Sequence, residues 1–325
     1  MTEVSEAAGP QPQQKSCSCV GIRSCRLCED PGFREAHQLH PIRAAPTAST
    51  GTLHTDAEGV SVVVFEDGRA VHPENLPVPF VGFHLFGDVI EDEETETAII
   101  REIEAWPWQP SQSGRWKQDF GPRANFKKRQ LKIPAEWHGV PEYAHRLLRQ
   151  LRARSERLHD FEVAEFLTLK YDVTRGANHA LHVDDLWLWG ERILGVSLLG
   201  ASVFTFFDPV NNIAIRVPLP RRSAYLISDR VRVDWQHGIF TEDIENDRIA
   251  LTYRELTPVV AATDLGRVAI ARAQNIIASP SLQAADVGNL EKCMRLGAQA
   301  TCAAESATHE REAAVAHQLM ARAVT

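Results

Sequence analysis

Apolar residues recur along the chain in two rhythms, one with the period of a helix and one with the period of a strand. The helical rhythm occurs twice, with apolar positions at Ile99, Ile100, Ile103 and Trp106 and again at Tyr143, Leu147, Leu148 and Leu151. Proline stops a helix but suits its first turn, so Pro107 should end the first helix and Pro141 should begin the second. The pattern therefore predicts two amphipathic helices, each with one buried face.

Short apolar segments separated by turn residues dominate the middle of the chain. Residues 60–65, VSVVVF, precede Glu-Asp-Gly and a second apolar stretch, which predicts a β-hairpin. From 162 to 256, apolar segments are broken by Gly, Pro, Asn or Asp, without intervening helices. Many short strands of this kind are typical of a β-sandwich or jelly roll. We therefore expect a mainly β fold with flanking helices (α+β).

Composition and patterning divide the chain into five parts. Residues 1–16 are rich in Pro, Gln and Ala and should be disordered, 17–30 form a cysteine cluster, and 31–58 read as a linker. Residues 59–260 carry the predicted domain, and 261–325 form an Ala-rich helical tail. Part of the tail resembles a single ankyrin repeat, which could not stand alone; a generic helical tail packed on the core is the alternative.

The totals exclude several classes of protein. With 325 residues, 44% of them hydrophobic, the chain can bury a sizeable core. It has no apolar run of membrane-spanning length and no secretory signal, so we expect a cytoplasmic and nuclear protein without membrane contact. The net charge of −8 argues against a chain-wide grip on nucleic acid. Residues 91–104 are acidic, however, and 115–132 are strongly basic.

The most informative chemical pattern is the triplet His182-x-Asp184 followed by a distant His237. Two imidazoles and one carboxylate can occupy one face of an Fe(II) ion and leave three positions open. On a strand, residues two apart point to the same face, so His182 and Asp184 could both reach one ion. An H-x-D triplet is common by chance, and a lone His is more often a packing residue than a ligand.

Two arginines make the pattern more specific. Arg248 and Arg254 follow His237, and fixed cations at that point could clamp a dicarboxylic co-substrate. The ordered set suggests an oxygenase that uses Fe(II), 2-oxoglutarate and O2.

Four cysteines lie close together near the start of the chain, at Cys17, Cys19, Cys25 and Cys28. Four thiolates close in sequence suit one structural zinc ion, although the C-x-C start is tight for such a site. A reduced, flexible segment is the alternative reading.

These residues resemble the AlkB branch of the 2-oxoglutarate/Fe(II) dioxygenases. The resemblance rests on CSCVGIRSCRLCE, QSGRWKQDFGPRANFKKRQLK, HVDDLWLWGERILGVSLL, VPLPRRSAYLISDRVRVDWQHGI and RIALTYREL. It covers roughly residues 17–30 and 80–257. The resemblance implies a double-stranded β-helix (jelly-roll) dioxygenase core within the mainly β fold.

The resemblance also implies roles for individual residues. His182, Asp184 and His237 match the iron ligands, Arg248 matches the arginine at the distal carboxylate of 2-oxoglutarate, and Tyr171 and Arg254 match further co-substrate contacts. Asp185, next to the iron-binding Asp184, could act in catalysis by orienting His182 or a substrate.

Two positions depart from the family pattern. Leu169 and Ala250 stand where many members have asparagine, so we expect fewer polar contacts to 2-oxoglutarate.

The implied reaction is oxidative removal of an N-methyl group, and the residues leave its substrate open. The homolog 4 branch of the family suggests N-methyl-lysine on a protein, with actin as the associated target. Methylated DNA carrying N6-methyladenine is the alternative partner. The basic stretch 115–132 suits an acidic protein surface or a phosphate backbone equally well. A non-catalytic scaffold that retains an oxygenase core is a third reading.

Overall fold

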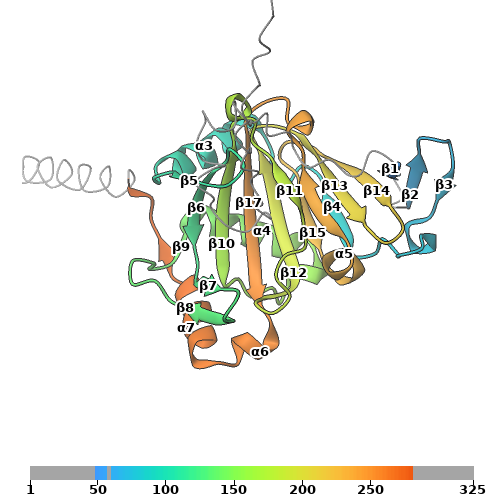
Figure 1. The fold of residues 1–325 in the computed structure, drawn as a ribbon. Coiled ribbons are helices and arrows are strands. Elements are labelled where there is room, and N and C mark those ends of the chain that lie inside the picture. The colour runs from blue at the N-terminus through green and yellow to red at the C-terminus, as the bar shows by residue number, and fades with distance from the viewer. Residues whose placement is uncertain (1–47, 57–59, 281–325) are drawn as a thin grey trace, which may run out of the picture. The chain divides into compact units, whose positions relative to one another are not determined.

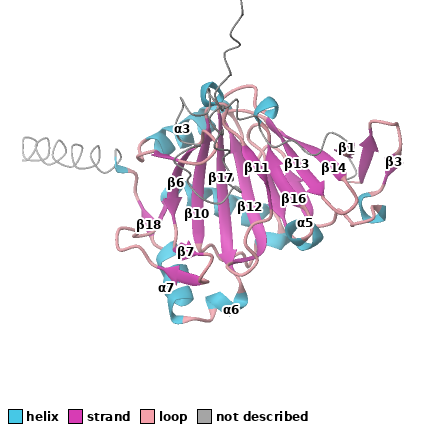
Figure 2. Ribbon diagram, viewed as in Figure 1, coloured by secondary structure: helices cyan, strands magenta, loops and turns pink. Residues whose placement is uncertain are grey.

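The computed structural model describes residues 48–56 and 60–280, in which strands greatly outnumber helices (Figures 1 and 2). One sheet has seven strands in the order β11 (His179–His182), β16 (Gln236–Ile239), β13 (Ser202–Asp208), β14 (Ile213–Leu219), β1 (Ser49–Thr55), β2 (Ser61–Phe65) and β3 (Ala70–Val71). We call this the first sheet. The second sheet has the order β4 (Phe83–Phe86), β15 (Ala224–Ile227), β12 (Trp189–Leu198), β17 (Arg248–Leu256), β10 (Glu165–Tyr171), β6 (Trp116–Phe120) and β5 (Gln109–Pro110).

Smaller elements complete the described fold. Two short pairs of strands join β7 (Arg123–Asn125) to β8 (Gln130–Lys132) and β9 (Val140–Pro141) to β18 (Ile276–Ile277). The helices are α3 (Glu93–Glu104), α4 (Glu142–Arg154), α5 (Asp229–Val233), α6 (Pro258–Ala261) and α7 (Asp264–Ala273). None of these helices has the length and apolarity needed to cross a membrane.

The two sheets pack face to face through an apolar layer. Phe204 and Phe206 of β13 belong to the same buried cluster as Ile193, Tyr225 and Leu169 of the second sheet. The rings of Phe204 and Tyr225 meet across the layer with centroids 5.1 Å apart. Two facing sheets of mostly antiparallel strands form a double-stranded β-helix or jelly roll, so the predicted fold class is confirmed.

The other face of the second sheet is covered by helices. Alternate residues of its strands point away from the first sheet, and the apolar positions of α3 and α4 pack on them in a second buried cluster. Both predicted amphipathic helices are confirmed, with Pro141 capping the N-terminus of α4. The second sheet is therefore packed on both faces, by the helices on one side and by the first sheet on the other.

The ends of the domain differ from the sequence prediction. Residues 49–55 fall in the predicted linker, yet they form β1, which pairs with β14 and β2. The sequence of this strand, STGTLHT, is mostly polar and does not show the alternation of a buried strand. Its contact with β2 is made by a small residue, Gly51, which packs against Val63 and Phe65. The linker prediction is therefore wrong over these residues.

At the other end, α7 begins at Asp264, within the predicted tail, but buries Ala269 and Ala273 in the helical layer. The domain thus extends beyond residue 260, at least to β18. The cysteine cluster at 17–28, the segment 1–16 and the ankyrin-like stretch beyond 280 lie outside the described residues.

The hairpin predicted from residues 60–65 is confirmed, because β2 pairs with β3 through a turn.

Candidate active site

His182, Asp184 and His237 come together between the two sheets. His182 ends β11 and lies directly opposite His237 of β16 in the strand register, with ring centroids 4.4 Å apart. Asp184 lies two residues beyond the end of β11, and its two oxygens approach His182 Nε2 at 4.0 Å and His237 Nε2 at 3.8 Å. One ligand atom from each residue lies within 4.8 Å of the others. The prediction that Asp184 would lie on the strand is wrong, but the loop still brings it to the same point.

The protonation state of the histidines suits a metal site. Burial lowers the pKa of His237 to about 3 and also lowers that of His182. Both rings are therefore neutral near pH 7. Because neutral rings form no ion pair with Asp184, ion pairing does not explain why the three side chains lie together. His182 Nδ1 donates to the carbonyl of Ala180 at 2.9 Å, which leaves Nε2 with a free lone pair toward Asp184.

A buried arginine holds the loop that carries Asp184. Arg232 of α5 is fully buried and donates to four backbone carbonyls, those of Asp184, Asp185, Trp189 and Gly190, at 2.9–3.2 Å. Such a fixed loop presents a carboxylate in one position.

Asp185 belongs to the same loop and has a structural role. Its Oδ1 accepts hydrogen bonds from the backbone N–H groups of Trp187 and Leu188 at 2.9 and 2.8 Å. The predicted role of Asp185 in orienting His182 is wrong, because the Ala180 carbonyl has that role, whereas its role in orienting a substrate stays a prediction. Of the two nearby tryptophans, Trp189 at the start of β12 lines the pocket, and Trp187 in the loop packs on the helical layer.

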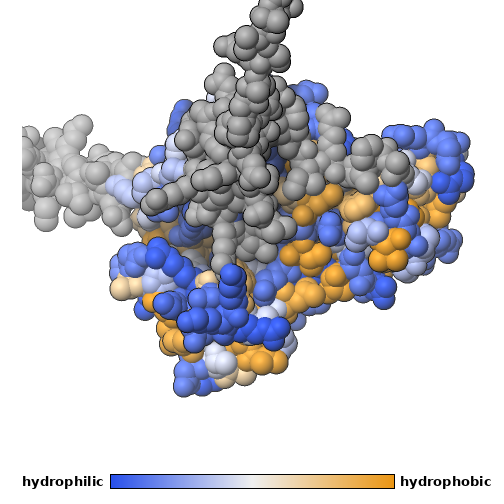
Figure 3. Space-filling view, viewed as in Figure 1, coloured by the Kyte–Doolittle hydropathy of each residue, from blue (hydrophilic) through white to orange (hydrophobic). Residues whose placement is uncertain are grey.

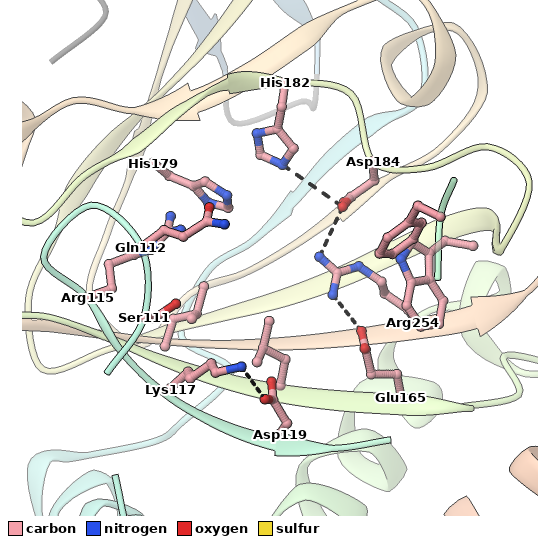
Figure 4. A pocket seen from close by; sticks show the side chains of 14 residues that line it. Ser111, Gln112, Arg115, Lys117, Asp119, Glu165, His179, His182, Asp184 and Arg254 are labelled. Carbon is pink, nitrogen blue, oxygen red and sulfur yellow. Dashed lines mark hydrogen bonds and ion pairs between the residues drawn. The ribbon is translucent and has the colours of Figure 1, made fainter. Parts of the chain in front are cut away.

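Arg254 connects Asp184 to a second buried carboxylate. Its Nη2 donates to Asp184 Oδ1 at 3.1 Å, and its Nη1 donates to Glu165 Oε2 at 2.6 Å (Figure 4). Burial alone would raise the pKa of Asp184, but the positive charges of Arg254 and Arg232 lower it below its usual range. Asp184 is therefore an anion at any working pH. The contact of Arg254 with 2-oxoglutarate stays a prediction. Its Nε has no hydrogen-bond partner among the described residues and is available for such a contact.

Arg248 lies deep between the sheets beside Tyr171. It is fully buried, its Nε donates to Ser197 Oγ at 3.0 Å, and its Nη1 and Nη2 have no hydrogen-bond partner among the described residues. Its Cζ lies 5.2 Å from the centre of the Tyr171 ring, its partner in the strand register. A buried guanidinium with two free N–H edges is suited to a carboxylate.

The two departures from the family pattern face each other. Leu169 of β10 and Ala250 of β17 are cross-strand partners, and both are buried. They make the floor of the site apolar at this point.

A pocket of about 200 Å³ opens onto His182 and Asp184. Its walls include residues that the sequence analysis did not select, namely Ser111, Gln112, Arg115, Lys117, Asp119, Phe126, Glu165 and His179. Figure 4 shows Gln112 and Arg115 on the side of His179, away from Arg254. Strand alternation could have found Glu165, which lies in phase with Leu167, Leu169 and Tyr171.

The donor set suits Fe(II) and 2-oxoglutarate. Two neutral imidazoles and one ionised carboxylate match the ligands of non-haem Fe(II), and Arg248 offers free donors for a dicarboxylate. A jelly roll with such a site between its sheets is the arrangement of a 2-oxoglutarate/Fe(II) dioxygenase.

The curated relatives of this chain agree with this class. The chain is 30% identical over 273 residues to the mouse (Mus musculus) alpha-ketoglutarate-dependent dioxygenase alkB homolog 4, covering 75% of this chain and 87% of the relative. It is also 30% identical over 256 residues to a DNA N6-methyl adenine demethylase of Caenorhabditis elegans, covering 74% and 87%. No family model matches. A solved structure, that of OsALKBH1, aligns at a TM-score of 0.40 and 14% identity over 53% of this chain and 97% of that chain.

The chain belongs to the AlkB family of 2-oxoglutarate-dependent dioxygenases. It is therefore an oxidoreductase that depends on iron, 2-oxoglutarate and O2.

Proposed function

We propose that this protein removes the methyl group of N-methyl-lysine from a folded protein, with actin as the first candidate. When bound, Fe(II) with 2-oxoglutarate and O2 supplies the oxidation of the methyl carbon, after which the methyl group leaves as formaldehyde. His182, Asp184 and His237 would hold the metal, and Arg248 with Tyr171 would hold the distal carboxylate. The protein's side chains would position the metal and the co-substrate. Arg232 and Arg254 hold Asp184 in place through hydrogen bonds to its backbone carbonyl and its carboxylate.

The small volume of the pocket is the observation that favours methyl-lysine over a methylated base. Ligand sites for molecules of drug size measure about 300–1,000 Å³. The pocket here measures about 200 Å³ and also has to admit part of the co-substrate. What is left suits the narrow end of an extended side chain better than a flat base with its sugar.

The surface beside the pocket mouth supports docking of a larger partner. Phe126 lines the pocket, and the turn that follows it carries Lys127, Lys128 and Arg129, all exposed. None of these three cations has an ion-pair partner among the residues that the structure describes. Figure 3 shows a hydrophilic surface in this region, over β7 and β8. Such a cluster would attract an acidic protein surface.

Methylated DNA is the second candidate. The worm relative is named for N6-methyl adenine in DNA, and a free side-chain amide, that of Gln112, could pair with the edge of an adenine. The same basic turn would then contact phosphates.

The test compares three substrates at several salt concentrations, with formaldehyde and succinate as readouts. They are intact methyl-lysine protein, a peptide of the same local sequence, and a methylated oligonucleotide. We expect the intact protein to be the best substrate, because the docking surface lies outside the peptide. Strongly salt-dependent turnover of methylated DNA, with none on methyl-lysine protein, would show that the proposal is wrong.

Charge reversal at the turn sharpens the comparison. The triple variant Lys127→Glu, Lys128→Glu, Arg129→Glu should lower turnover of the intact protein and leave turnover of the peptide unchanged. If DNA is the substrate, the same variant should reduce the log–log salt slope by about 3 units. Arg149→Glu is the matched control, since Arg149 is exposed on α4 and does not line the pocket.

A further inference from the structure

One wall of the pocket carries buried polar atoms that nothing in the described structure satisfies. Gln112 is 4% exposed and Arg115 is 3% exposed. The Nε2 and Oε1 atoms of Gln112 and the Nε and Nη1 atoms of Arg115 have no hydrogen-bond partner among the described residues. Buried polar groups in folded proteins are nearly always hydrogen-bonded, so four such atoms at one pocket wall point to a ligand that completes them.

The turn that carries these two side chains is firmly held. Ser111 N–H donates to the Arg115 carbonyl at 2.9 Å, and Arg115 N–H donates to the Gln112 carbonyl at 3.2 Å. From outside the turn, Arg175 Nε donates to the Gly114 carbonyl and Asn178 N–H to the Ser113 carbonyl, both at 3.0 Å. A turn anchored in this way presents its side chains in a preset position, as a binding site requires.

Arg115 lies in line with the co-substrate residues. Trp116 pairs with Lys170, so Arg115 falls opposite Tyr171, which in turn pairs with Arg248. Tyr171 therefore has a guanidinium on each side, with Arg115 Cζ at 5.8 Å and Arg248 Cζ at 5.2 Å from its ring centre. Arg115 also lines the same pocket as His179, whose ring stacks on the ring of His182 with centroids 4.2 Å apart.

No carboxylate of the pocket wall is free to pair with Arg115. Asp119 is bound by Lys117 at 2.6 Å, and Arg254 binds both Glu165, at 2.6 Å, and Asp184, at 3.1 Å. The apolar floor at Leu169 and Ala250 offers no donors to a ligand. The side wall is therefore the part of the pocket that combines free donors with positive charge, which suits an anion and repels a methylated ammonium.

We propose that Gln112 and Arg115 bind the keto-acid end of 2-oxoglutarate, while Arg248 binds the distal carboxylate. Arg115 and Gln112 Nε2 donate to oxygens of that end. Gln112 Oε1 remains to accept a hydrogen bond from an N–H group of the incoming substrate. The two residues thus replace the contacts that Leu169 and Ala250 cannot make. This inference rests on the dioxygenase co-substrate and not on the identity of the methylated substrate.

Binding measurements on the full chain test the proposal without turnover. Mn(II)-loaded protein, kept free of O2, is titrated by calorimetry with 2-oxoglutarate and with 2-oxobutanoate, which keeps the keto-acid end but lacks the distal carboxylate. Arg115→Met should weaken both ligands about tenfold or more, and Arg115→Lys should recover part of the loss. Gln112→Leu should weaken both by a smaller factor. Arg248→Met, the matched control, should weaken 2-oxoglutarate and leave 2-oxobutanoate unchanged.

The same titrations can overturn the proposal. Wild-type affinity for both ligands in Arg115→Met and Gln112→Leu would refute it. Loss of 2-oxoglutarate binding with normal 2-oxobutanoate binding would place Arg115 at the distal carboxylate and would also refute it. If Arg115→Met fails to fold, Arg115→Lys and Gln112→Leu decide. A wrong substrate class leaves these results unaffected, because no methylated substrate is present.

Discussion

Replacing Arg248 should weaken co-substrate binding and stabilise the ligand-free protein at the same time. Arg248 is fully buried and has one hydrogen bond, from Nε to Ser197 Oγ at 3.0 Å. Its Nη1 and Nη2 are without partners among the described residues. Arg248 therefore destabilises the ligand-free protein and strengthens the binding of the co-substrate.

The two effects can be estimated separately. Removing one partner of a buried, hydrogen-bonded charge pair costs about 2–5 kcal/mol, so Arg248→Met should raise the Kd for 2-oxoglutarate by roughly 1.5 to 3.5 orders of magnitude. An unsatisfied buried donor costs about 1–3 kcal/mol, and Met fills similar space without that cost. The unfolding free energy of the ligand-free variant should therefore rise by roughly 1–3 kcal/mol.

Calorimetry with the Mn(II) form and thermal unfolding with and without 2-oxoglutarate measure both quantities. Saturating co-substrate at about 100 times Kd should stabilise the wild type by about 2.7 kcal/mol, and the variant should lose most of this gain at the same concentration. Arg248→Lys is the control, because it keeps the charge but not the planar pair of donors. An unchanged Kd together with a lower stability would refute the reasoning, since Arg248 would then be a structural residue.

Three further outcomes follow from the site. His182→Ala or Asp184→Ala should abolish succinate production and Mn(II) binding with an unchanged circular dichroism spectrum; normal turnover in both would exclude them as ligands. Arg232→Ala should cost about 3 kcal/mol in urea unfolding and weaken Mn(II) binding, because the loop after β11 loses charge-assisted hydrogen bonds at four carbonyls. Burial raises the pKa of Glu165 from 4.5 to about 7 despite the opposing charge of Arg254. The folded protein then holds a proton that the unfolded chain has lost, so stability should fall by up to about 3 kcal/mol between pH 4.5 and 7. Thermal melts of Glu165→Gln should lack that slope, and parallel curves would contradict the shift.

The sequence predicted the parts of the site that depend on residue type and short spacing. His182 and Asp184 are two residues apart, so any extended backbone brings them near one another. His237 was selected by chemistry, and the register of β11 with β16 places it opposite His182. Both amphipathic helices were also predicted, because their apolar period is local and strong.

Other residues escaped prediction because their roles depend on partners far away in the chain. Arg232 looks like a surface arginine in the sequence DRVRVD, yet it is fully buried against carbonyls more than forty residues earlier. The backbone contacts of Asp185 also escaped prediction, because its Oδ1 accepts hydrogen bonds from the N–H groups of Trp187 and Leu188 only once the loop turns back. The strand β1 escaped because its burial comes from Gly51 packing against β2, which a polar sequence does not reveal.

The sequence by itself determined the strand and helix periods, the metal-binding chemistry and the arginines available for a dicarboxylate. Side-chain chemistry and local periodicity are properties of the residues themselves, so no partner is needed to state them. Only the tertiary structure decided which groups are left without partners. Arg115, Arg248 and Arg254 look alike in sequence. The register of β10 with β17 and the loop after β11 give both Nη atoms of Arg254 a carboxylate partner, whereas, within the described part of the chain, Arg115 has no carboxylate partner and both Nη atoms of Arg248 are unsatisfied. This difference matters for binding because the donors are buried. An unpaired donor costs free energy only where water cannot reach it, and a ligand that pairs with it removes that cost.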